Sequence, residues 1–281
     1  MKIRFGPAGK PINYKGDMAG VPAYLSKIGL DALEYEAVRG VRIKEEKARL
    51  LGEEAEKHGV LLSMHAPYYI NLASKEKEKA EASRKRLYQA VRASHWMKAY
   101  AVVFHPGYYK GWTSPVEATK EVIRQLKVLV DEITTDGYTY PWLAPETTGK
   151  DSQVGSLDDI IMICTEIPKC RPTVDWAHLY ARNQGKTVLT VEQIVEVIDR
   201  LEKELGSDPI NPLHTHFSKI EYGKGGEKMH HTLEEDEYGP DWRIVCKAYA
   251  ELGINATVIS ESPILEEDAL VMKKICEEVK K

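Results

Sequence analysis

Asp175 and His178 are the residues whose types and spacing first indicate chemistry. They follow a short β-like run, Pro172 to Val174, so both side chains can turn toward the end of one strand. Aspartate and histidine are ligands for a divalent ion such as zinc or manganese. An Asp-x-x-His pair arises often by chance, however, so the pair alone is weak evidence for a metal site.

The same arrangement recurs along the chain, because most β-like runs end in an aspartate, glutamate or histidine. The other metal-capable side chains at these ends are His65, His105, Glu146, His214, His216 and Glu261. His214 and His216 are two residues apart and point to the same face of a strand, so either could be the ligand. Converging carboxylates would repel one another without a cation. We therefore predict a metal site, with zinc or manganese favoured by the many imidazoles, and with more donors than one tetrahedral zinc needs.

Eight β-like runs alternate with helix-period segments. The runs are Lys2–Phe5, Ala32–Ala37, Leu61–His65, Ala101–His105, Trp142–Glu146, Pro172–Asp175, Leu213–Phe217 and Ala256–Ser260. The amphipathic segments lie near 19–28, 44–57, 76–98, 115–133, 156–165, 191–205, 240–252 and 265–280. This alternation predicts an α/β fold, a (β/α)8 TIM barrel that forms a single domain over residues 1–281. A doubly wound open sheet is the alternative, but no glycine-rich phosphate loop follows the first run.

One connection, from about residue 218 to residue 239, is much longer than the others. It follows the seventh run and contains Gly223, Gly225 and Gly226. Long connections that carry no element of their own are often functional. We therefore predict a lid or binding loop there.

The composition excludes few classes of protein. Lys+Arg 39 against Asp+Glu 43 gives a formal net charge of −4, so there is no general basic excess of the kind that nucleic-acid-binding domains usually show. The four cysteines show no C-x-x-C spacing, and we expect reduced, mostly buried thiols. No stretch has the length and apolarity of a signal peptide or a membrane helix. A soluble, cytoplasmic monomer is therefore expected.

Seven short segments carry a family resemblance. They are Met64–Leu72, Phe104–Gly107, Pro145–Gly149, Val174–His178, His216–Lys219, His230–His231 and Ser260–Pro263. Together, and in this order, they resemble endonuclease IV, the zinc-dependent apurinic/apyrimidinic endonuclease family within the xylose-isomerase-like barrels. The resemblance implies that a metal-bridged hydroxide cleaves the DNA phosphodiester bond 5′ to an abasic site, with Glu146 as the bridging catalytic carboxylate.

The resemblance also implies the ligand sets of two or three zinc ions, with manganese possible. The first ion would take His65, His105 and Glu146, and the second would take Glu146, Asp175, His216 and Glu261. His178 and His230 would hold the third. For contacts with DNA, the resemblance and the neighbouring loops suggest Tyr68, Arg39, Arg182 and Lys219.

Two departures from the family pattern bear on this prediction. The third zinc would also need an aspartate where this chain has Lys228, which cannot ligate while charged, unless Glu227 reaches into the site. The second run carries Glu34 and Glu36 where the family has a basic DNA-penetrating segment, and both carboxylates would oppose a phosphate backbone.

These departures keep two other functions open. One is a sugar isomerase or epimerase of the same barrels, in which Glu146, Asp175, His216 and Glu261 bind a single manganese or cobalt ion and carboxylates move a proton next to a carbonyl. The extra imidazoles favour the endonuclease, whereas the acidic second run favours the isomerase. The other is a barrel that binds DNA or a metabolite without catalysis.

Overall fold

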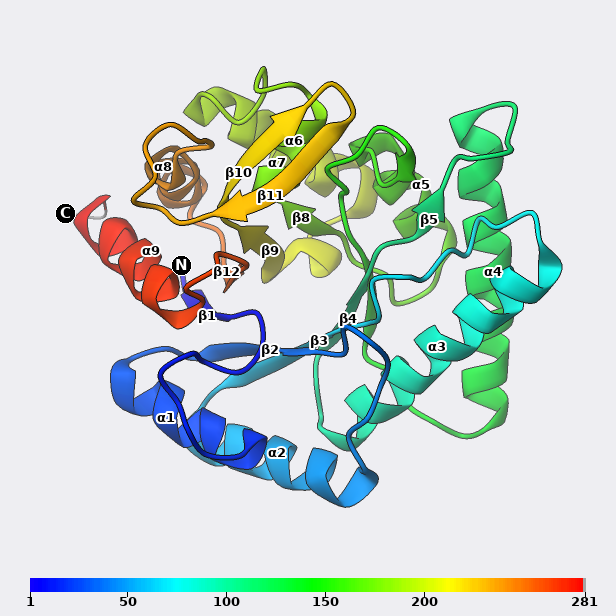
Figure 1. Cartoon of the computed structure of the whole chain (residues 1–281), viewed down its shortest axis with the longest axis horizontal. Helices are drawn as coiled ribbons and strands as arrows, with labels where there is room; N and C mark the ends of the chain where they lie inside the picture. Colours follow the sequence, from blue (N-terminus) through cyan, green and yellow to red (C-terminus); the bar gives the residue numbers. More distant parts are fainter. Residues whose placement is uncertain (280–281) are drawn as a thin grey trace.

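Parallel strands form a closed barrel in the computed structural model, which describes residues 1–279 (Figure 1). The barrel strands are β1 (Ile3–Pro7), β2 (Ala32–Glu36), β3 (Leu61–His65), β4 (Ala101–Phe104), β6 (Trp142–Pro145), β8 (Thr173–Asp175), β9 (Leu213–Phe217) and β12 (Ala256–Ser260). They form two hydrogen-bonded arcs, β2-β3-β4-β6 and β1-β12-β9-β8. Parallel bridges between Glu146 and Thr173, and between Ala8 and Glu34, join the arcs at their two edges. The predicted TIM barrel and its eight strands are confirmed, with ends that shift by one or two residues.

Helices surround the barrel, and each follows one of the barrel strands in the chain. They are α1 (Val21–Ile28), α2 (Glu45–His58), α3 (Lys77–Trp96), α4 (Pro115–Thr135), α5 (Leu157–Glu166), α6 (Trp176–Arg182), α7 (Val191–Leu205), α8 (Trp242–Leu252) and α9 (Glu266–Val279). All except α6 were predicted, although residue 280 of the last predicted segment lies outside the described residues. The short α6 begins directly after β8, because the Asp175 carboxylate accepts a hydrogen bond from the backbone N–H of His178 (2.8 Å) and caps the helix.

The long connection is an antiparallel hairpin rather than a loop without structure. Its strands are β10 (Lys219–Gly223) and β11 (Gly226–His231), and a bulge lies between Glu221 and Tyr222. In Figure 1 the hairpin lies beside α6, at the end of β8 and β9. A second, very short antiparallel pair, β5 (Gly107–Tyr108) and β7 (Gln153–Val154), follows β4 and β6. Both pairs extend the carboxyl-terminal side of the barrel.

The apolar core lies between the strands and the helices, whereas the interior of the barrel is polar. Leucine, isoleucine, valine, alanine and aromatic side chains from every helix pack into one large cluster against the outer faces of the strands. Inside the barrel, Glu34, Ser63, His214, His216 and Thr257 are all buried. Buried polar groups are stable only when they have partners. The strand sequences therefore place their chemistry on the axis of the barrel and at its mouth.

One prediction about the cysteines is wrong. Cys246 of α8 and Cys276 of α9 form a disulfide, with their Cα atoms 5.5 Å apart, whereas Cys164 and Cys170 are buried free thiols as expected. The pairing arises because α8 and α9 are neighbours, which the spacing of 30 residues along the chain does not reveal. The cysteines therefore give no support for a reducing compartment.

Among residues 1–279, no helix is both long enough and apolar enough to cross a membrane.

The seam between β1 and β2 predicts a sensitive glycine. A Cβ atom at Gly6 would overlap the backbone carbonyl of Ala32, which cannot move without opening the barrel. We expect Gly6→Ala to lower the free energy of unfolding by roughly 1–3 kcal/mol, as overpacking does. Gly225→Ala, where nothing lies within 4 Å of the added atom, is the matched control. Denaturant unfolding measures both, and equal stabilities of the two variants would contradict the seam as described.

Candidate metal centre

Glu146 is the carboxylate around which the predicted ligands gather. It follows β6 at the mouth of the barrel and is completely buried. Its Oε2 atom lies 3.1 Å from His65 Nε2 and 3.0 Å from His105 Nε2. Its Oε1 atom lies 3.2 Å from His178 Nδ1 and 3.2 Å from His216 Nδ1. Four imidazoles from four strand ends therefore surround one carboxylate.

Three overlapping groups of donor atoms can be distinguished at this mouth. In each group the ligand atoms lie within 4.8 Å of one another. The groups are His65, His105 and Glu146; Glu146, Asp175, His216 and Glu261; and His178, His230 and Glu261. The structure thus brings together all eight residues predicted as ligands, and it adds Glu261 to the third group. Metal binding by these residues remains a prediction.

Three of the histidines are oriented by a hydrogen bond to their second ring nitrogen. Nδ1 of His65 lies 2.7 Å from the carbonyl of Ala66, and Nδ1 of His178 lies 2.9 Å from that of Thr147. A carbonyl only accepts, so Nδ1 carries a hydrogen in both rings, and each ring in its neutral form would offer Nε2 to a metal ion. In His230, Nδ1 lies 2.7 Å from the Ser218 hydroxyl. Partners of this kind fix the rings of metal-binding histidines.

The hairpin supplies the carboxylate that Lys228 cannot provide. Glu227 Oε2 lies 3.3 Å from His178 Nε2, on the side of the ring that faces the mouth. Lys228 points elsewhere and pairs with Glu221 at 2.9 Å. The bulge in the hairpin shifts the register by one residue, so the acid comes from position 227 instead of 228. The condition stated from the sequence, that Glu227 reaches in, is met.

The electrostatics of the mouth favour a bound cation. Burial raises the pKa of Asp175 to about 7, with Glu261 and Glu146 adding to the increase despite the opposing effect of His178. Burial likewise raises the pKa of Glu36, which lines the same cavity, to about 8. Buried oxygens of Asp175, Glu36 and Glu227 have no hydrogen-bond partner among the described residues. A cation would satisfy these oxygens, and the mixture of imidazoles and carboxylates fits zinc or manganese.

The cavity at the mouth has a volume of about 170 Å³. It is lined by Glu36, Val38, His65, Ala66, Tyr68, His105, His178, Glu227, His230 and Glu261. Tyr68 is 56% exposed at its edge and packs edge-to-face with Tyr69. Arg39 is also exposed, in the turn after β2. Tyr68 is therefore placed where a bound substrate could touch it.

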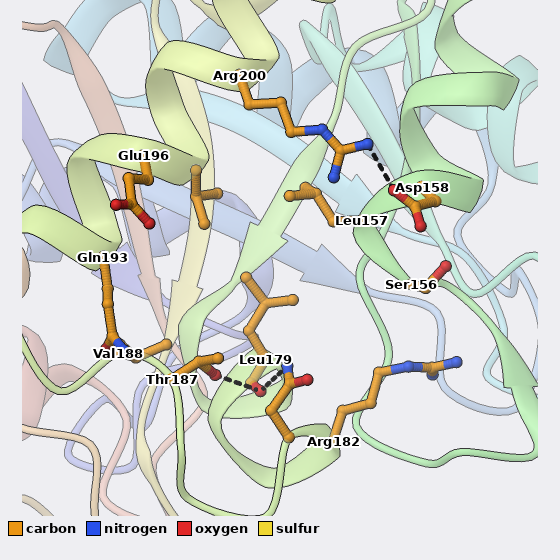
Figure 2. A pocket seen from close by; sticks show the side chains of 12 residues that line it. Ser156, Leu157, Asp158, Leu179, Arg182, Thr187, Val188, Gln193, Glu196 and Arg200 are labelled. Atoms are coloured by element: carbon orange, nitrogen blue, oxygen red, sulfur yellow. Dashed lines mark hydrogen bonds and ion pairs between the residues drawn. The ribbon is translucent and has the colours of Figure 1, made fainter.

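The other two residues suggested for DNA contacts have structural partners instead. The Arg182 guanidinium donates to the carbonyls of Lys150 (2.7 Å) and Gln153 (3.1 Å) and so ties the loop after β6 to α6. It borders a separate cavity of about 430 Å³ between α5, α6 and α7, which Figure 2 shows. Lys219 is only 8% exposed and donates to the carbonyl of Glu235 (3.0 Å). Because their donors are already used, neither residue supports a phosphate contact.

Glu34 belongs to the site in a way that the sequence did not predict. Glu34 was expected to face a phosphate backbone, but it is completely buried inside the barrel and therefore cannot. His214 Nε2 contacts Glu34 (3.0 Å) below the mouth, so His216 is the member of the pair that reaches the ligand groups. Burial would raise the pKa of Glu34, but the neighbouring imidazoles hold it well below its usual value. The alternation of Glu34 and Glu36 along a strand was the only available signal.

Comparison with known proteins identifies the family. The family model described as xylose isomerase-like TIM barrel matches residues 22–275. An uncharacterized protein of Methanocaldococcus jannaschii is 36% identical over 98% of this chain and 97% of its own length. A probable endonuclease 4 of Aquifex aeolicus is 28% identical over 60% of this chain and 59% of its own length.

Solved structures with different functions share the fold. Endonuclease IV from Thermus thermophilus aligns with a TM-score of 0.69 and 21% identity, over 99% of this chain and 100% of its own. A D-tagatose 3-epimerase-like protein aligns with a TM-score of 0.70 and 19% identity, over 99% of this chain and 97% of its own. At such identities the likeness shows the fold alone. With its family model matched along nearly the whole barrel, the chain belongs to the xylose isomerase-like TIM barrel family.

Proposed function

We propose that the protein is a zinc-dependent endonuclease that cleaves the DNA phosphodiester bond 5′ to abasic sites, as a cytoplasmic monomer in DNA repair. One observation carries the proposal: Glu146 is shared by four imidazoles, and the three donor groups overlap. Eight imidazole and carboxylate side chains exceed what one ion can use, so the site suits two or three ions. The similarity to the probable endonuclease 4 of Aquifex aeolicus supports the same interpretation.

We assign a role to each residue of the mouth according to its position. Divalent ions bound there would activate water and neutralise charge on the phosphoryl oxygens. Glu146 would bridge two ions, while Asp175 and Glu261 balance the charge of the second group. Tyr68 is an exposed aromatic ring at the edge, suited to stack on a base or sugar beside the lesion. Arg39 supplies a positive charge for the DNA backbone.

A second candidate is a sugar isomerase or epimerase with one manganese or cobalt ion. Glu146, Asp175, His216 and Glu261 form a complete four-ligand group without the other histidines. Glu36, with its raised pKa, could exchange a proton with a substrate in the mouth. The fold shared with the D-tagatose 3-epimerase-like protein is compatible with this alternative. It leaves His65, His105, His178 and His230 without a use, which is why we place it second.

The bridging position of Glu146 can be tested by Glu146→Gln. We expect at least about a 100-fold loss of nicking on an abasic DNA duplex, since removing one group that stabilises developing charge costs about 10²–10³ in kcat. Glu166→Gln, which changes an exposed carboxylate at the end of α5, should nick like the parent. Undiminished cleavage by Glu146→Gln would contradict the assignment.

Metal content and substrate together separate the two candidates. Metal analysis of the purified protein should find two or three zinc ions per chain, because three of the donor groups overlap at the mouth. The same preparation is assayed on abasic duplex and on a panel of ketoses. A single manganese ion together with conversion of a ketose would favour the isomerase or epimerase and reject the endonuclease.

The shifted carboxylate predicts different effects for two consecutive residues. Glu227→Gln should weaken binding of one zinc ion at least about tenfold, since the ligand beside His178 is lost. Lys228→Ala should leave zinc binding unchanged, because Lys228 pairs with Glu221 away from the mouth. Titration against a chromophoric chelator measures both. Equal affinities in the two variants would mean that Glu227 does not hold a metal ion.

A further inference from the structure

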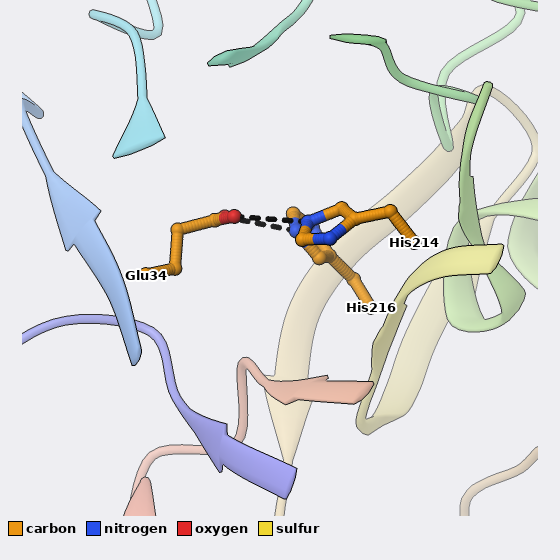
Figure 3. Close-up of side chains that lie close together, drawn as sticks. All are labelled: Glu34, His214 and His216. Carbon is orange, nitrogen blue, oxygen red and sulfur yellow. Dashed lines mark hydrogen bonds and ion pairs between the residues drawn. The ribbon is translucent and has the colours of Figure 1, made fainter. Parts of the chain in front are cut away.

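His216 is held differently from the other histidines of the mouth. In His65 and His178, Nδ1 contacts a backbone carbonyl oxygen, and in His230 it contacts a hydroxyl group. Nδ1 of His216 faces Glu146 and Glu261, at 3.2 Å from each. Its Nε2 atom points down the barrel axis to Oε1 of Glu34, 2.9 Å away (Figure 3). This ring therefore lies between two sets of carboxylates.

Glu34 itself is fixed from several sides. Its Oε2 atom accepts a hydrogen bond from the Ser63 hydroxyl (2.7 Å) and lies 3.0 Å from His214 Nε2. The other nitrogen of His214 contacts the Tyr100 hydroxyl. All these partners come from the barrel interior, where Glu34, Ser63, His214 and His216 are nearly or completely inaccessible to solvent. The carboxylate thus has little freedom to turn away from His216.

We propose that Glu34 is a positioning residue for the metal centre. Its carboxylate accepts a hydrogen bond from the Nε2–H group of His216, so that Nδ1 is the metal-binding nitrogen. This inference rests on the proposed function, since it assigns a role toward a bound metal ion. Glu34 Oε1 and His216 Nε2 lie 2.9 Å apart as an ion pair, and neither atom has a hydrogen-bond partner among the described residues. Both ring nitrogens of His216 face carboxylates, which only accept when ionised. A metal ion held with Glu146 and Glu261 would replace the Nδ1 hydrogen, and Glu34 would then be the acceptor that keeps the hydrogen on Nε2.

The chemical consequence concerns ligand strength as well as direction. A carboxylate behind a histidine fixes the tautomer, holds the plane of the ring and makes the ligating nitrogen more basic than a carbonyl does. Glutamine at position 34 would have nearly the same shape, but its amide could donate to His216 Nε2. The ring could then carry its hydrogen on Nδ1, which would face the mouth and block the metal. One atom exchanged inside the barrel would change the ligand at the mouth.

The test compares Glu34→Gln with Glu166→Gln. Both remove one carboxylate, but Glu166 is an exposed residue at the end of α5 that pairs with Lys127, so Glu166→Gln controls for the loss of a charge outside the metal centre. We expect zinc affinity, measured by chelator competition, to fall about 10–100-fold for one ion in Glu34→Gln, the usual effect of losing such a partner. A fall of equal size in Glu166→Gln, or parental affinity in Glu34→Gln, would overturn the proposal.

A second measurement does not depend on the variant folding. In the zinc-loaded parent protein, ¹⁵N-labelled histidine should show His216 with a hydrogen on Nε2 that exchanges slowly with solvent, assigned by its absence in His216→Asn. A hydrogen on Nδ1 of His216 would overturn the proposal. The outcome is separable from the nuclease assay: zinc binding that depends on Glu34 without nicking rejects only the proposed function, and nicking with an Nδ1 hydrogen rejects only the role of Glu34.

Discussion

The structure depends on the close packing of buried carboxylates. Glu34, Glu146 and Asp175 are completely buried, and Glu261 lies among them, within a barrel whose outer shell is apolar. Each charge removed from water costs free energy unless a partner is provided, and like charges at such distances raise the cost further. The imidazoles offset part of this cost, because each one lies within 4 Å of at least one carboxylate oxygen. Oxygens of Asp175 and Glu227 have no hydrogen-bond partner among the described residues. A cation bound there would offset the remaining cost of burying these charges.

The barrel fold makes this packing possible, since parallel strands carry all their carboxyl ends to one side. The residues that follow β3, β4, β6, β8, β9 and β12 converge although they are far apart in the chain. The β10–β11 hairpin, the short β5–β7 pair and α6 are then added on that side. The Asp175 carboxylate makes two contacts: one oxygen caps α6, and the second oxygen faces His178.

The sequence predicts the features that depend on neighbouring residues, but not those that depend on contacts between distant residues. Strand ends and ligand types are local, so the eight strands and the eight candidate ligands could be predicted from periodicity and family resemblance. Glu34 could not be placed, because its role depends on His214 and His216, about 180 residues away. Glu227 could be stated only as a condition, because a single bulge decides which residue of β11 faces the mouth. The Cys246–Cys276 disulfide, likewise, depends on the packing of two helices.

The same charge argument separates the candidate functions. A single ion held by Glu146, Asp175, His216 and Glu261 would leave His65 and His105, which contact Oε2 of Glu146, without an ion, and would leave Glu227 beside His178. His65, His105 and Glu146 would hold a second ion. Glu34 is consistent with this arrangement, because it contacts His216 from inside the barrel and adds no ligand at the mouth. The arrangement is therefore better matched to several cations acting on a phosphate than to one cation acting on a sugar.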